Sequence, residues 1–290
     1  MSWRIVVISR RAKLELKMNY LVVRDDEVKR VHLSEISTII IETTAASLTT
    51  SLLCELSKRK IKVIFCDERR NPSSELIPYY GAHDTSGKVR EQVGWRSETK
   101  SMIWTEIITE KIRNQARVLD EFKKEESKLI FSYIPQILLR DESNREGHAA
   151  KVYFNALFGM DFTRTADNAT NATLNYGYSI LLSAFAREIV SAGYITQLGL
   201  FHDNQFNQFN LASDLMEPFR QLVDRKVYLI RPDEFSKEEK IEMINILNMT
   251  VEIAGRRQYV NNAIKIYCKS VFEALNEEDI SEICFYRYEF

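Results

Sequence analysis

The chain has 290 residues, enough for one or two domains with a substantial core. Its 45% hydrophobic content, with only nine glycines and five prolines, excludes a disordered protein. The formal net charge of −1 excludes a nucleic-acid binder that acts through bulk charge, so such a partner would need local basic patches.

The N-terminus and the cysteines indicate a cytoplasmic protein. The first residues, Met1 to Arg4, lack the basic start and apolar stretch of a signal peptide, and no apolar run is long enough to span a membrane. The four cysteines form no C-x-x-C pair: Cys54, Cys66, Cys268 and Cys284. We therefore expect reduced thiols, rather than a zinc site or a disulfide framework, and no membrane partner.

Residues 1–80 show the patterns of β-strands. Between Ala12 and Met18, apolar and charged residues alternate strictly, which is typical of a half-buried strand. Short β-branched runs predict further strands at 5–8, 20–23, 28–33, 36–41 and 61–65. One helix is predicted where Leu48, Leu52 and Leu56 repeat every four residues. Nothing in this small β-rich domain suggests catalysis.

The pattern changes twice after residue 80. Residues 81–94 are polar and glycine-containing, which predicts a linker. Beyond Trp95, apolar residues recur at helical spacing, from Trp104 to Phe122 and again from Val260 to Leu275. We therefore predict an α+β protein: a β-rich N-terminal domain over 1–80, a linker over 81–94 and a larger all-α domain over 95–290.

Two interpretations compete for Glu146. Ser143 and Glu146 form the pattern S-x-x-E, which is typical of a capping box at the start of a helix. Alternatively, Glu146 is a metal ligand, kept ionised by the backbone N–H groups of the helix N-terminus. The local pattern alone favours the capping box.

A second group of polar residues lies between Ile195 and Arg220. His202 stands in a loop rich in Asn and Gln, and the apolar run that follows predicts a helix. On that helix Asp214, Glu217 and Arg220 would share one face. An imidazole near carboxylates suits Mn²⁺ or Mg²⁺. The alternative, which spacing alone favours, is an ordinary loop histidine beside a surface ion pair.

Four sequence blocks in this order resemble the CRISPR-associated integrase endonuclease, the universal nuclease subunit of the spacer-acquisition complex. The blocks are R-E-G with A-A and Y-F between Arg145 and Phe154, N-A-T-L-N-Y-G-Y at Asn171–Tyr178, G-L-F-H at Gly199–His202, and D-L-M-E-P-F-R at Asp214–Arg220. The short N-terminus is similar to the type II branch, which accompanies single-protein RNA-guided effectors.

The resemblance implies a metal-dependent DNA endonuclease and integrase. Its metal ligands and catalytic residues would be Glu146, His202 and Glu217, holding Mg²⁺ or Mn²⁺. Asp214 matches another acidic position, whose role is left open. In this family the 3′-hydroxyl of a captured DNA fragment attacks a phosphodiester at the edge of a CRISPR repeat.

The resemblance also implies the partners. These are double-stranded DNA, a second copy of the chain paired through residues 1–80, a small ferredoxin-like CRISPR-associated subunit in a heterohexamer, and the effector nuclease. The side chains considered for contact with nucleic acid are Tyr176, Tyr178, Arg220, Arg256 and Arg257. For the two tyrosines, packing inside the protein is an equal alternative.

Two other functions remain open on the sequence. His148 with the His202-Asp203 doublet would suit an HD-type metal phosphohydrolase, which is also helical. A non-catalytic DNA-binding assembly subunit is the alternative from a different class, although the presence of Glu146, His202 and Glu217 argues against it.

Overall fold

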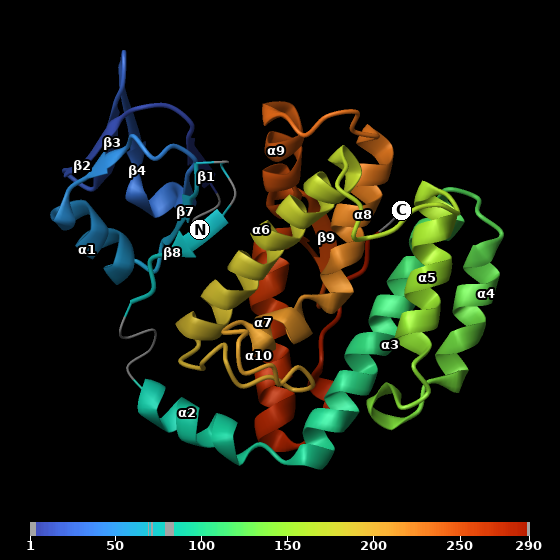
Figure 1. The fold of residues 1–290 in the computed structure, drawn as a ribbon. Helices are drawn as coiled ribbons and strands as arrows, with labels where there is room; N and C mark the ends of the chain where they lie inside the picture. Colours follow the sequence, from blue (N-terminus) through green and yellow to red (C-terminus); the bar gives the residue numbers. More distant parts are fainter. Residues whose placement is uncertain (1–3, 69, 71, 79–83, 289–290) are drawn as a thin grey trace. The chain divides into compact units, whose positions relative to one another are not determined.

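The computed structural model describes residues 4–68, 70, 72–78 and 84–288. Contacts within the chain divide it into two compact units, one ending at Thr85 and one beginning at Ser86 (Figure 1). The first unit is rich in strands and the second is mainly helical, as the α+β prediction requires.

The first unit contains two four-stranded sheets. One has the order β1-β5-β7-β8, in which β1, β5 and β7 are parallel and β8 is antiparallel to β7. Its strands are β1 (Arg4–Ile8), β5 (Ile36–Ile41), β7 (Lys62–Cys66) and β8 (Pro72–Glu75). The sequence patterns predict the first three of these strands but not β8.

The other sheet has the order β4-β3-β2-β6. Strands β2, β3 and β4 form an antiparallel meander, and the short β6 pairs parallel to β2. The bounds are β2 (Lys13–Lys17), β3 (Tyr20–Arg24), β4 (Val28–His32) and β6 (Ser47–Leu48), with the 3₁₀ helix η1 (Leu33–Glu35) after β4. The strict alternation of residues 12–18 thus forms strand β2.

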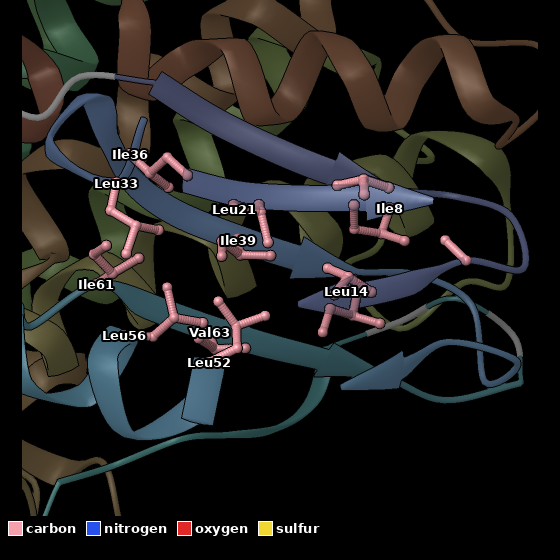
Figure 2. Close-up of a cluster of buried hydrophobic side chains, with 13 residues drawn as sticks. Ile8, Leu14, Leu21, Leu33, Ile36, Ile39, Leu52, Leu56, Ile61 and Val63 are labelled. Atoms are coloured by element: carbon pink, nitrogen blue, oxygen red, sulfur yellow. The ribbon is translucent and has the colours of Figure 1, made fainter. Parts of the chain in front are cut away.

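The core of the first unit is aliphatic (Figure 2). It combines Leu14 and Leu21 of one sheet, Ile39 of the other, and Leu52 and Leu56 of helix α1 (Thr50–Lys58), all with no exposed surface. Of the leucines predicted to repeat along a helix, Leu52 and Leu56 place α1 against the sheets, whereas Leu48 lies in strand β6 instead. Burial of such side chains supplies most of the stability of a small unit.

The second unit is built from helices, with short 3₁₀ turns between them (Figure 1). The helices are α2 (Thr85–Gly94), α3 (Ser97–Glu121), α4 (Glu126–Tyr133), α5 (Arg145–Phe158), α6 (Ala169–Ser191), α7 (Asn210–Leu215), α8 (Arg220–Ile230), α9 (Lys237–Ile244) and α10 (Val260–Glu277). The 3₁₀ turns are η2 (Ile134–Gln136), η3 (Leu139–Asp141), η4 (Glu217–Phe219), η5 (Asn245–Asn248) and η6 (Ile280–Glu282). None of the helices described is both long and apolar enough to cross a membrane.

Helix α2 occupies most of the segment predicted as a linker. Its residues are polar, so it lacks the apolar stripe by which helices are recognised in a sequence. It is held instead by Gln92, whose buried side chain donates to the carbonyls of Ile195 and Leu198, at 2.8 and 3.1 Å. Residues 81–83 of the predicted linker lie outside the described residues.

The prediction of an all-α second domain is wrong at one place. Strands β9 (Thr250–Ile253) and β10 (Arg256–Tyr259) form an antiparallel hairpin. Ala254 and Gly255, which connect them, both have positive φ, 50° and 69°. Positive φ at both central residues is the geometry of the type I′ turn that matches the twist of a two-stranded hairpin.

Helix α3 is the element around which the site is assembled. Its apolar residues Trp104, Ile108 and Ile112 are buried, as their spacing predicts. It contacts α5 on one side and both η4 and α8 on another. Asn114 fixes one of these contacts, because its buried amide donates to the carbonyl of Pro218 at 3.1 Å. Side chains of α3 therefore lie between α5 and η4.

Candidate active site

The first turn of α5 is capped by Asp141. Its Oδ1 accepts from the N–H of Arg145 at 2.8 Å and its Oδ2 from the N–H of Glu146 at 2.9 Å. The N-cap residue, Asn144, has φ 50° and makes no side-chain cap, and the hydroxyl of Ser143 bonds to Asp141. The capping-box interpretation is therefore wrong, and the carboxylate of Glu146 is left for another contact.

Lys111 of α3 joins the carboxylates of Glu146 and Glu217. Its Nζ lies 2.5 Å from Glu146 Oε1 and 2.5 Å from Glu217 Oε2. Burial by itself lowers the pKa of Lys111, but attraction to Glu217 and Glu146 outweighs burial and raises it. The structure therefore places a charged ammonium between two carboxylates that come from separate elements.

Glu217 is a buried carboxylate with two basic neighbours. Its side chain is 5% exposed, and its Oε1 accepts from Arg220 Nε at 2.9 Å. Burial favours the neutral acid, but Lys111 and Arg220 outweigh it, so the pKa of Glu217 is lowered and the group is ionised. The predicted pair at i, i+3 spacing thus forms, but it is not on the surface.

The helix predicted to carry Asp214, Glu217 and Arg220 is interrupted. Helix α7 ends at Leu215, η4 contains Pro218, and α8 begins at Arg220. Proline has no N–H to donate within a helix and clashes with the preceding turn, which accounts for the break. Because of it, Asp214 makes contacts different from those of Glu217.

Asp214 holds the loop that carries His202. Its side chain has no exposed surface, and it accepts from three backbone N–H groups, those of Leu200, Phe201 and His202, at 2.6, 3.1 and 3.2 Å. Its Oδ1 also lies 2.5 Å from Nδ1 of His202. This hydrogen bond, opposed by partial burial, raises the pKa of His202. It also fixes the imidazole so that Nε2 is the nitrogen left for a ligand.

The histidine is further confined by packing. Phe201 stacks on Trp104 with ring centroids 4.5 Å apart, and the imidazole meets both rings edge-on. Gly199 closes the turn, because a Cβ there would lie 2.4 Å from the carbonyl oxygen of His202 and 2.7 Å from Asp214 Oδ2. The loop therefore requires glycine at this position.

The three predicted ligands share one neighbourhood but do not form a closed shell. Both Glu217 and Glu146 raise the pKa of His202 by their charge. Yet across the described residues no three acidic, imidazole or thiol groups converge as a metal shell. Lys111 stands between two of them instead. The imidazole of His202 and the carboxylates of Glu146 and Glu217 are nevertheless the types of ligand that Mg²⁺ or Mn²⁺ binds.

The tyrosines considered for DNA contact are buried. Tyr176 is 2% exposed and Tyr178 is 9% exposed. The hydroxyl of Tyr178 donates to Asp224, and the guanidinium of Arg220 lies 4.7 Å from the centroid of the Tyr178 ring. Burial raises the pKa of Asp224 to about 6. The packing alternative therefore describes both tyrosines in this structure.

The other candidate residues are exposed. Arg256 and Arg257 lie on strand β10 of the hairpin. His148 and Asp203, on which the HD-type alternative depends, are both exposed. Sequence reasoning missed Lys111 and Asp141. The run Asp141-Glu142-Ser143-Asn144 carried a signal for Asp141, since aspartate is a preferred helix cap, whereas no local spacing indicates Lys111.

Comparison with known proteins identifies the family. The model of the family described as CRISPR associated protein Cas1 matches residues 5–263. A protein of Neisseria meningitidis named CRISPR-associated endonuclease Cas1 is 37% identical over 229 residues, which cover 78% of this chain and 75% of that protein.

Two solved structures share the fold. A casposase bound to its integration product has a TM-score of 0.77 at 19% identity, over 95% of this chain and 91% of that chain. A chain of a Cas6-RT-Cas1–Cas2 complex has a TM-score of 0.73 at 18% identity, and the match covers 97% of this chain but 36% of that longer one. The chain therefore belongs to the CRISPR-associated Cas1 family of endonucleases.

Proposed function

We propose that Glu146, His202 and Glu217 bind one Mg²⁺ or Mn²⁺ and that this site joins DNA by transesterification. The 3′-oxygen of a captured fragment forms a bond to a phosphorus at the edge of a CRISPR repeat, and the bond from that phosphorus to the adjoining strand breaks. One observation supports this proposal most directly. The carboxylates of Glu146 and Glu217 share one cation, the ammonium of Lys111, near a histidine that Asp214 holds in place.

Each side chain has a role that its contacts support. When bound, the divalent ion would polarise the phosphodiester and neutralise charge in the transition state. Asp214 holds His202 in one tautomer and orientation, which raises the basicity of the free nitrogen. Arg220 fixes Glu217 through Oε1 and leaves Oε2 on the side of Glu146 and Lys111.

Substitution of the three ligands tests the site. Glu146→Gln, His202→Ala and Glu217→Gln should each remove Mn²⁺ binding in calorimetry and metal-dependent DNA cleavage, while DNA binding persists. Because Asp141 caps α5, Glu146→Gln should leave the melting temperature nearly unchanged. The matched controls are Glu142→Gln and Asp203→Asn, which alter exposed acidic residues close by. Cleavage that survives all three ligand substitutions would contradict the site. Absence of metal-dependent cleavage by the wild type would instead indicate a non-catalytic DNA-binding subunit.

The chemistry of joining can be tested on the DNA itself. A fragment with 3′-hydroxyl ends should be joined to repeat-containing DNA, and a fragment with 3′-deoxy ends should not, because the attacking oxygen is missing. Hydrolytic nicking, in which water is the nucleophile, should survive. Equal joining from both fragments on a denaturing gel would contradict transesterification.

We also propose that the protein acts as a homodimer with a Cas2-type subunit, in a heterohexamer. The solved Cas6-RT-Cas1–Cas2 complex supports such a partner. In the first unit, the meander of β2, β3 and β4 exposes apolar side chains at both of its ends. Met18 and Tyr20, beside the β2–β3 turn, are 92% and 40% exposed, and Val28, at the start of β4, is 53% exposed. A symmetric dimer needs a self-complementary patch, and we propose that this meander supplies it.

A charge placed on that patch tests the dimer. Met18→Lys with Val28→Lys should give a monomer in light scattering and should abolish joining, although the active site is intact. Ile77→Lys, which alters another exposed residue of the same unit, is the control. A wild-type protein that is monomeric at micromolar concentration would contradict the dimer.

We also propose three further features. The chain is of the type II branch, the effector nuclease is a partner, and Arg256 and Arg257 contact phosphates.

A further inference from the structure

We infer that Lys111 is a built-in counter-cation, which occupies the space between Glu146 and Glu217 when no metal is bound and competes with the metal for them. This inference rests on the proposed metal site. It assigns to α3 a residue that sets how tightly the site binds a divalent ion.

The position of Lys111 is fixed by its helix. The side chain is 9% exposed, and the same helix buries Ile108 one turn before it and Gln115 one turn after it. Asn114 ties α3 to the carbonyl of Pro218, next to Glu217. The backbone of Lys111 is therefore held against η4, and only its long, flexible side chain is able to move.

The ammonium contacts both carboxylates directly. Its Nζ donates to Glu146 Oε1 and lies at the same distance, 2.5 Å, from the buried Glu217 Oε2. Both contacts are attractions between opposite charges, and another cation can replace such an attraction.

A divalent ion and the ammonium would need the same oxygens. Mg²⁺ binds carboxylate oxygens at about 2.0–2.1 Å, so an ion on Glu146 Oε1 and Glu217 Oε2 would take the place that Nζ now holds. Two cations at such separation repel strongly in a buried site. Metal binding must therefore displace the ammonium from at least one carboxylate, and this displacement opposes binding.

The same contact stabilises the metal-free protein. Without Lys111, the buried carboxylate of Glu217 would keep only Arg220 as a basic partner and would face the partly exposed carboxylate of Glu146. Loss of a charged partner from a buried carboxylate is destabilising. Lys111 therefore has opposite effects on two measurable quantities: it stabilises the protein without metal, and it weakens the affinity for metal.

Lys111→Met separates these effects, because methionine keeps much of the length and loses the charge. Mn²⁺ binding measured by calorimetry on the full-length protein should tighten by about tenfold or more. The melting temperature in EDTA should fall, and the rise produced by Mn²⁺ should exceed that of the wild type. Lys128→Met, which removes one exposed charge from α4, is the matched control and should change neither quantity. Weaker or unchanged Mn²⁺ binding by Lys111→Met would overturn the competition.

A second measurement needs no metal and guards against a variant that fails to fold. In EDTA, Glu217→Gln should restore much of the melting temperature that Lys111→Met loses, because it removes one of the two repelling charges. If neither the wild type nor Lys111→Met binds Mn²⁺, the proposed metal site fails, and the EDTA series still decides whether Lys111 is the counter-cation. Additive losses in the double variant would overturn that role.

Discussion

The two units differ most in what they bury. The first unit buries aliphatic side chains such as Leu14, Ile39 and Leu56. Among its described residues the buried charged side chains are Glu42 and Lys62, and Lys62 pairs with Glu75. The second unit buries charged side chains from several helices, among them Glu110, Lys111, Asp214, Glu217 and Asp224. Removing a charge from water costs several kcal/mol unless partners compensate it. The first unit is therefore stabilised mainly by apolar burial, whereas the second holds buried charges that depend on partners to compensate them.

The largest effect is expected from the aliphatic core. Ile39→Ala should lower the free energy of unfolding by about 3–4 kcal/mol, because it leaves a cavity in a fully buried site. Denaturant titration measures the loss, and Mn²⁺ affinity should stay at the wild-type value. Ile77→Ala, at an exposed site of the same unit, is the control. A change in the Mn²⁺ affinity of Ile39→Ala would show that the core of the first unit also affects the metal site of the second.

The next effect concerns the pH dependence of stability. Asp224 has its pKa raised from 3.8 to about 6, so the folded protein binds the proton more readily than the unfolded chain. Below about pH 4 the carboxyl group of Asp224 is protonated in both the folded and the unfolded protein. As pH rises from there through about 6, the unfolded chain loses the proton first, so the free energy of unfolding falls. The full shift corresponds to about 3 kcal/mol. Asp224→Asn should abolish this dependence in unfolding experiments between pH 4 and pH 8, and a wild type with flat stability would contradict it.

Asp214→Asn probes the link between buried charge and catalysis. An amide nitrogen would face backbone N–H groups that now donate to a carboxylate oxygen, so His202 would lose its fixed orientation. Loss of such a supporting hydrogen bond typically costs about ten- to a hundredfold in metal affinity. Mn²⁺ titration and the joining assay should show this loss. Asp203→Asn, at the exposed neighbouring position, should not.

The smallest effect is expected at the start of α5. Asp141→Ala removes the acceptor of two backbone N–H groups and should cost about 1 kcal/mol of stability in denaturant titration. Ser143→Ala should cost much less, because Ser143 accepts from neither of these groups. Equal losses from the two variants would restore the capping box to Ser143.

The sequence predicts the periodic elements and fails where tertiary contacts decide. Alternation along residues 12–18 identifies β2, and the apolar stripe from Val260 to Leu275 identifies α10. Helix α2 is missed because one glutamine, Gln92, anchors it through distant carbonyls. The hairpin at 250–259 is missed although Ala-Gly between short runs is a turn signal.

The candidate site was only partly predictable. The assignment of Glu146, His202 and Glu217 came from resemblance, because the spacing of these residues alone favoured a cap and a surface ion pair. Pro218 carried the signal that the helix after Leu211 would break. Lys111 carried none, since its contacts with two carboxylates exist only when α3, α5 and η4 pack together.

The turn around Asp214 has a consequence for protein engineering. Because the backbone from Leu200 to His202 is tied directly to a buried carboxylate, the position of the imidazole does not depend on the side chains that follow it. Phe206, further along the same loop, is 87% exposed. Gln205 and Phe206 can therefore be randomised in a library that screens for altered activity, while the histidine keeps its place. Asn207 should be retained, because its Oδ1 accepts from the N–H of Phe209 at 2.9 Å.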